Sequence, residues 1–169
     1  MLVVLWRLWV LWPVWALWAA PAPAQAQVER DSQPGVRAEG RIDAIIARRT
    51  AVEAGIGAVV PAGIYVRLGG DVAGGVIAGG AQPAGAAARA DVFGRFLLDP
   101  LAEHRWGPYV TGGASYEANS RDHGRVYLLA LVGIEGPRQG RVVPAIEAGL
   151  GGGFRIGFVL RRAQPTGWR

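Results

Sequence analysis

The chain contains no cysteine and no lysine, and it has only two histidines, His104 and His123. Without cysteine there are no disulfides, no thiolate metal sites and no lipidated N-terminal cysteine. With no second histidine close to either one, the sequence predicts solvated loop histidines, no metal site and no cofactor. All 18 basic residues are arginines, but they alternate with acids instead of clustering, which disfavours a nucleic-acid partner.

Long apolar runs are also missing after residue 20, although half of the 169 residues are apolar. Residues 1–20 are apolar and rich in tryptophan, and small residues at Ala24 and Ala26 form an A-x-A cleavage signal. We therefore expect a signal peptide over residues 1–26, with a retained membrane anchor as the alternative. Residues 27–39 are polar and contain a Pro-Gly pair, which predicts a flexible lead-in.

A period of two dominates the rest of the chain and is clearest near its end, over residues 154–161. Such alternation places the two sets of side chains on opposite faces of a strand. The apolar set, which we expect to face lipid, is Phe154, Ile156, Phe158 and Leu160, and the opposite set is Arg155, Gly157, Val159 and Arg161. A soluble protein would bury the apolar face, whereas a membrane barrel would turn it outward.

Six further stretches have the same parity, with apolar residues at even positions: 51–60, 64–79, 89–99, 106–117, 125–135 and 142–150. Residues 40–49 fit either a short helical stripe or a strand. If residues 40–47 form a strand, the count is eight; splitting the long stretch at residues 69–71 is another way to reach eight. Because bacterial barrels have even strand numbers, we expect an all-β, antiparallel up-and-down transmembrane barrel of eight strands.

The odd face carries both signs of charge. An eight-stranded barrel has room inside only for its own side chains, and buried charges must be paired. We therefore expect a lumen charge network that forms a polar plug, with a narrow water or ion path as the alternative. Its expected members are Glu53, Arg67, Asp71, Arg89, Asp91, Arg95, Glu117, Arg125, Glu135, Glu147 and Arg155.

Two aromatic residues on the even face, Trp106 and Tyr116, lie ten residues apart. At about 3.3 Å per residue and a tilt near 40°, this separation projects to roughly 25 Å along the barrel axis. Aromatic girdles bracket an apolar band of about that height. The spacing therefore predicts that both side chains mark the edges of a lipid-facing band.

The chain resembles the small outer-membrane β-barrels of the OmpA transmembrane-domain and opacity type over residues 40–162. The resemblance rests on the signal peptide and three motifs: G-x-Y-x-R-L at residues 63–68, R-W-G-P-Y-V-T-G-G at 105–113, and E-A-G-L-G-G-G-F-R at 147–155. It implies insertion by the outer-membrane assembly machinery and a structural, adhesive or weakly conducting role. Two features depart from the family: the loops are short, and Arg169, not an aromatic residue, ends a tail over residues 163–169.

The leading interpretation is a non-enzymatic, monomeric outer-membrane barrel of a diderm bacterium, structural or narrow and porin-like, in contact with outer-membrane lipid. One alternative is a soluble periplasmic barrel that binds an apolar ligand, which requires the even-parity residues to point inward. Another is a lipid-modifying enzyme at the barrel rim, built from Ser115, Ser120 and His123 with Asp122. If the parity is right, Ile156→Arg should block assembly far more than Arg161→Ala.

Overall fold

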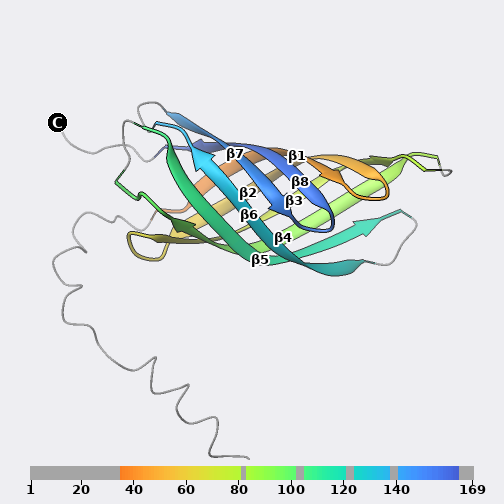
Figure 1. Cartoon of the computed structure of the whole chain (residues 1–169), viewed down its shortest axis with the longest axis horizontal. Helices are drawn as coiled ribbons and strands as arrows, with labels where there is room; N and C mark the ends of the chain where they lie inside the picture. The colour runs from red at the N-terminus through yellow and green to blue at the C-terminus, as the bar shows by residue number, and fades with distance from the viewer. Residues whose placement is uncertain (1–34, 81–82, 102–104, 121–123, 138–140, 164–169) are drawn as a thin grey trace, which may run out of the picture. The chain divides into compact units, whose positions relative to one another are not determined.

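The protein is described from a computed structural model that covers residues 35–80, 83–101, 105–120, 124–137 and 141–163. These residues form eight antiparallel strands that close into one barrel in chain order (Figure 1). The strands are β1 (Arg37–Ile46), β2 (Thr50–Pro61), β3 (Val66–Ala78), β4 (Gly85–Leu97), β5 (Gly107–Asn119), β6 (Arg125–Glu135), β7 (Val142–Leu150) and β8 (Phe154–Arg162). The prediction of an all-β, eight-stranded up-and-down barrel is confirmed.

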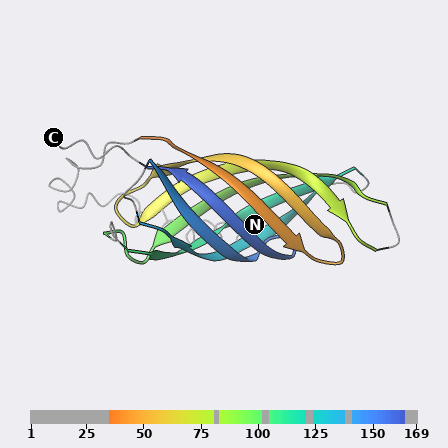
Figure 2. The same ribbon diagram turned by 90° about the horizontal axis from the view of Figure 1, so that it is seen from above.

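Closure of the barrel depends on pairing between the first and last strands. β1 pairs with β2 on one side and with β8 on the other, and Figure 2 shows the orange β1 beside the blue β8. Residues 40–49 were ambiguous in the sequence, but most of them belong to this strand, so the helical alternative is wrong. β1 begins at Arg37, so the end of the expected lead-in belongs to the barrel.

The remaining differences from the sequence prediction concern strand ends. β3 begins at Val66, not at Ile64, and continues without a break through residues 69–71. Trp106 directly precedes β5. The expected signal peptide, most of the lead-in and residues 164–169 lie outside the described residues. No helix in the described ranges is long and apolar enough to cross a membrane.

The strands are staggered around the barrel. If the paired residues are followed from each strand to the next around the barrel, the path returns to β1 about ten residues away from the residue where it started. With a rise of about 3.3 Å per residue and about 4.8 Å between strands, this stagger corresponds to a tilt of about 40° from the barrel axis. The tilt lies within the range of membrane barrels, and soluble barrels reach it as well.

The two barrel ends differ in their connections. One end, here called the terminal end, holds the start of β1, the end of β8 and the turns 62–65, 98–106 and 136–141. The other, here called the four-turn end, holds the turns 47–49, 79–84, 120–124 and 151–153. All seven connections are short, so the strands themselves make up most of the described chain.

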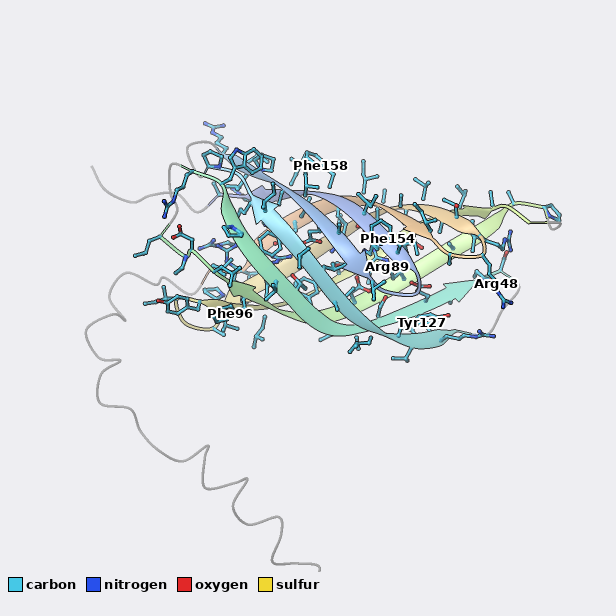
Figure 3. All side chains as sticks on the ribbon, in the orientation of Figure 1. Arg48, Arg89, Phe96, Tyr127, Phe154 and Phe158 are labelled. Atoms are coloured by element: carbon cyan, nitrogen blue, oxygen red, sulfur yellow. The ribbon has the colours of Figure 1, made fainter. Side chains whose placement is uncertain are left out.

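Side chains alternate strictly between the two faces of the barrel wall. In β8 the exposed and buried positions alternate along the whole strand, and the even-numbered residues are the exposed ones. Figure 3 shows Arg89 inside the ribbon and Phe96 and Phe158 outside it. Every strand pairs even residues with even residues, so one face stays outward around the whole barrel.

Candidate functional site: the charge network inside the barrel

The barrel interior is filled largely by charged side chains. Six arginines and seven carboxylates are buried, each with at most 6% of its surface exposed. Each of the thirteen takes part in at least one ion pair with another member of the set. These residues, here called the lumen network, are Glu39, Arg41, Asp43, Glu53, Arg67, Asp71, Arg89, Asp91, Arg95, Glu135, Glu147, Arg155 and Arg161.

Asp43 on β1 is one centre of the lumen network. It lies 2.7 Å from Arg41 Nε, 2.6 Å from Arg89 Nη2 and 3.2 Å from Arg155 Nη2. These arginines come from β1, β4 and β8, so one carboxylate joins three strands. Gly157 faces Asp43 across the β1–β8 seam, and a Cβ there would collide with the Asp43 carboxylate. The glycine therefore leaves room for the charge cluster.

Glu147 on β7 is the second centre, closer to the terminal end. It contacts Arg41 at 3.0 Å, Arg95 at 3.3 Å and Arg161 at 3.1 Å. Arg41 also contacts Asp43, so the two centres belong to one continuous system. Multidentate arginine–carboxylate pairing of this kind compensates for burying the charges, provided that the remaining donors and acceptors are also bonded.

Tyr109 on β5 connects the aromatic and charged parts of the interior. Its hydroxyl accepts a bond from Arg161 Nη2 at 2.8 Å and donates one to Glu147 Oε1 at 2.8 Å. The guanidinium carbons of Arg95 and Arg161 lie 5.2 and 4.8 Å from its ring centroid, within the range of cation–π contacts. The ring occupies the space beside Gly133, where a Cβ would collide with it.

Tyr109→Phe tests this hydroxyl. The substitution keeps the ring but removes both hydrogen bonds to charged groups, so the free energy of unfolding should fall by about 1.5–3 kcal/mol. Urea titration of the folded barrel measures the change. Tyr116→Phe, on the outer face of the same strand, is the matched control and should change the value by less than about 0.5 kcal/mol. Equal effects of the two substitutions would contradict the inward role of Tyr109.

The expected network and the observed one overlap in part. The structure buries and pairs nine of the eleven expected residues. Glu117 is only half-buried and Arg125 is exposed; although they are register partners, no ion pair joins them. These two residues lie outside the lumen network, near the four-turn end of the barrel.

Four buried charges were missing from the sequence prediction. Glu39, Arg41 and Asp43 belong to β1, whose secondary structure was ambiguous, and Glu39 fell in the expected lead-in. Arg161 was assigned to the inner face but not to the network, yet it contacts Glu39 at 2.8 Å and Glu135 at 2.9 Å. The alternation that includes Ile42 and Ala44 was the available signal for the β1 residues.

The outer face has the opposite composition. The even-numbered positions of the eight strands, from Ala38 to Leu160, carry no charged side chain. Among them, Thr50 and Tyr116 are the two residues with a hydroxyl group. Exposed large apolar residues occur on every strand, for example Ile42, Ile56, Val72, Val92, Val110, Leu128, Ile146 and Ile156. The expected lipid-facing residues Trp106, Tyr116, Phe154, Ile156, Phe158 and Leu160 are all 44–51% exposed.

Aromatic side chains lie near both ends of this outer face. At the terminal end, Tyr65 and Phe96 stack with ring centroids 5.9 Å apart, and Trp106 is exposed immediately before β5. Tyr116 and Phe154 lie toward the four-turn end. The two groups bracket the apolar outer surface, which is the arrangement of aromatic girdles.

Searches against protein-family models and against curated proteins found no match for this chain. Its function must therefore be argued from its own residues.

The rim-enzyme alternative has little geometric support. Ser115 is fully buried and points into the lumen, out of reach of a lipid at the rim, while Ser120 is exposed. His123 and Asp122 lie outside the described residues, as does His104. Within the described ranges, no group of three His, Cys, Asp or Glu side chains is placed to hold a metal ion.

Proposed function

We propose that the protein is a non-enzymatic outer-membrane β-barrel whose role is structural and whose lumen is closed by paired charges. The observation that carries this proposal is the inside-out distribution of polarity. Thirteen charged side chains are buried in the lumen, whereas the strand positions that face outward from Ala38 to Leu160 carry no charge. A lipid environment makes this the favourable arrangement, since apolar side chains then contact lipid and charges neutralise one another inside.

A soluble protein with this surface would be unusual. Monomeric soluble proteins rarely expose contiguous apolar patches larger than a few hundred Å², whereas apolar side chains are exposed here on all eight strands. The alternative of a soluble binder for an apolar ligand required the even-numbered residues to line the interior. They face outward instead, and the interior holds the lumen network.

An outer-membrane location is favoured because closed barrels leave no unpaired edge around the membrane core, and because the N-terminal sequence has the pattern of an export signal. The proposed contacts are outer-membrane lipid and the outer-membrane assembly machinery. The ion pairs favour a sealed lumen over a conducting one, because an ion entering the lumen would have to displace arginine–carboxylate contacts of 2.6–3.3 Å.

Heat-modifiability tests the membrane proposal. The chain from residue 27 onward should fold only with detergent or lipid, give a β-rich circular dichroism spectrum, and migrate differently on a gel before and after boiling. Closed barrels resist detergent denaturation until heated, because every strand is paired on both sides over most of its length. A chain that folds as a soluble monomer without detergent would contradict the proposal.

Current recordings in planar bilayers distinguish a sealed lumen from a conducting one. The folded protein should give no unitary current steps if the lumen network is sealed. Reproducible steps would overturn the sealed lumen but leave the membrane barrel in place.

A further inference from the structure

β6 is longer than the strand beside it. Its residues pair with β5 all the way to Arg125, but on the other side β7 ends at Leu150, opposite Ala130. Residues 125–128 of β6, here called the β6 free edge, therefore have a described strand on one side only, while Gly151 of the β7–β8 turn lies beside Leu129. Figure 1 shows the β7–β8 hairpin ending short of the β5–β6 hairpin at the four-turn end.

The register shows which backbone groups the β6 free edge presents. Gly136 N–H donates to Pro144 O at 2.7 Å, and these residues continue the β6–β7 register past Glu135 and Ala145. Hydrogen-bonded pairs alternate along an antiparallel ladder, so the even-numbered residues of β6 direct their N–H and C=O groups toward β7. Val126 and Leu128 thus direct two donors and two acceptors to a position where no described strand lies.

Unpaired strand groups are a template for another strand. The outward side chains at this edge are apolar, with Val126 70% and Leu128 79% exposed. On the inward side, Arg125 is exposed and makes no ion pair among the described residues. The edge thus combines free backbone groups, apolar side chains facing outward and one unpaired cation facing inward.

We propose that the β6 free edge is a strand-addition site for an extended peptide segment of another protein, with apolar residues outward and an acidic residue inward opposite Arg125. The added strand would run antiparallel to β6 beside residues 125–128, beyond the β7–β8 turn that follows Leu150. It would bond the four free groups of Val126 and Leu128, and its acidic residue would pair with Arg125. This is β-augmentation, in which backbone bonds provide affinity and alternate side chains provide specificity.

The direction of β6 excludes antiparallel pairing between the β6 strands of two copies that share one membrane orientation. β6 runs from the four-turn end to the terminal end. Two copies inserted with the same orientation have β6 strands running in the same direction, so they cannot pair antiparallel. A segment that is free to enter in the opposite direction meets the requirement. The inference goes beyond the proposed structural role. The exclusion of β6-to-β6 pairing rests on the proposed membrane orientation, whereas the free backbone groups of Val126 and Leu128 do not.

The test uses the folded chain from residue 27 onward in detergent micelles and the probe acetyl-Val-Thr-Val-Glu-amide, which begins beside Leu128. In the expected register its two valines lie beside Leu128 and Val126, and its glutamate lies beside Arg125. Amide hydrogen exchange should slow at Val126 and Leu128 when the probe is added and should stay unchanged at Val132, which already pairs with Ala148. The same probe ending in lysine should bind about tenfold more weakly or worse.

Two variants separate strand addition from nonspecific adsorption. Leu128→Pro removes an N–H that makes no ladder bond, so the barrel should fold, as edge strands tolerate proline, while probe affinity falls at least tenfold. Arg125→Glu should reverse the preference between the glutamate and lysine probes. Unchanged exchange at Val126 and Leu128 with both probes, or equal probe affinity in folded Leu128→Pro, would overturn the proposal. Loss of heat-modifiability in the unsubstituted chain would count against the membrane role alone.

Discussion

Replacing Asp43 with asparagine is expected to lower the free energy of unfolding by about 3–5 kcal/mol, the cost of breaking a buried ion pair by removing one partner. Asp43 is 1% exposed and compensates the charges of Arg41, Arg89 and Arg155. The substitution keeps the size of the side chain, so the space beside Gly157 stays filled. Urea-induced unfolding in lipid vesicles, followed by tryptophan fluorescence and gel mobility, measures the change.

The matched control is Asp99→Asn. Asp99 pairs with Arg105 outside the strands, where the arginine side chain is 75% exposed. Exposed pairs contribute at most about 1 kcal/mol because water and salt screen them. If the two substitutions cost the same, then the Asp43 carboxylate is hydrated in the folded protein, and the dry, paired interior described here is wrong.

Ile156→Arg on the outer face of β8 is expected to block assembly in lipid. An arginine that faces the hydrocarbon costs about 2–4 kcal/mol near the midplane of a membrane barrel and less toward the interfaces. Ile156 is 44% exposed, pairs with Ala44 on β1, and lies on the outer face between Phe154 and Phe158. The fraction of heat-modifiable protein after dilution from urea into vesicles reports the effect.

Ile156→Ala and Arg162→Ala are the controls for this experiment. Both should assemble normally, since one keeps an apolar outer face and the other changes an exposed residue at the end of β8. A soluble barrel would respond with the opposite sign, because arginine in place of an exposed isoleucine raises solubility. Normal assembly of Ile156→Arg would therefore indicate that this face contacts water.

The sequence suggested Arg161→Ala as the mild comparison for Ile156→Arg, and the structure makes that comparison unsuitable. Arg161 is 3% exposed and contacts Glu39, Glu135 and Glu147. Removing its side chain leaves these three carboxylates with one cation fewer. We therefore expect Arg161→Ala, although it lies on the inner face, to lower the free energy of unfolding strongly as well. The parity of Arg161 was correct, but parity alone does not show how many partners a side chain has.

The fold was predictable because alternation is a local property. Residues such as Phe154 and Ile156 repeat with a period of two, and this period is enough to assign faces and count strands. The weakest stretch was β1, where Ile42, Ile45 and Ile46 also match a helical spacing. Pairing on both sides of β1 decides in favour of a strand, and that information lies in β2 and β8, far away in the sequence.

The lumen network was only partly predictable for the same reason. Its contacts join residues up to 122 positions apart, as between Arg161 and Glu39. The inner face of a strand can be read from its own sequence, but the height of each residue in the barrel depends on the stagger of all eight strands. The sequence therefore indicated which charges point inward, but not that Glu117 is only half-buried and Arg125 exposed near the four-turn end.

The register of the pairing between β1 and β8 also determines which of several possible closed barrels forms. A slip of two residues between these strands would keep every apolar side chain outward, so lipid contact cannot distinguish the slipped barrel from the native one. The charges can, because Glu39 lies directly opposite Arg161 in the native register and would face Val159 or Ala163 after a slip. The interior ion pairs therefore select the native register between β1 and β8, which the apolar outer surface cannot do.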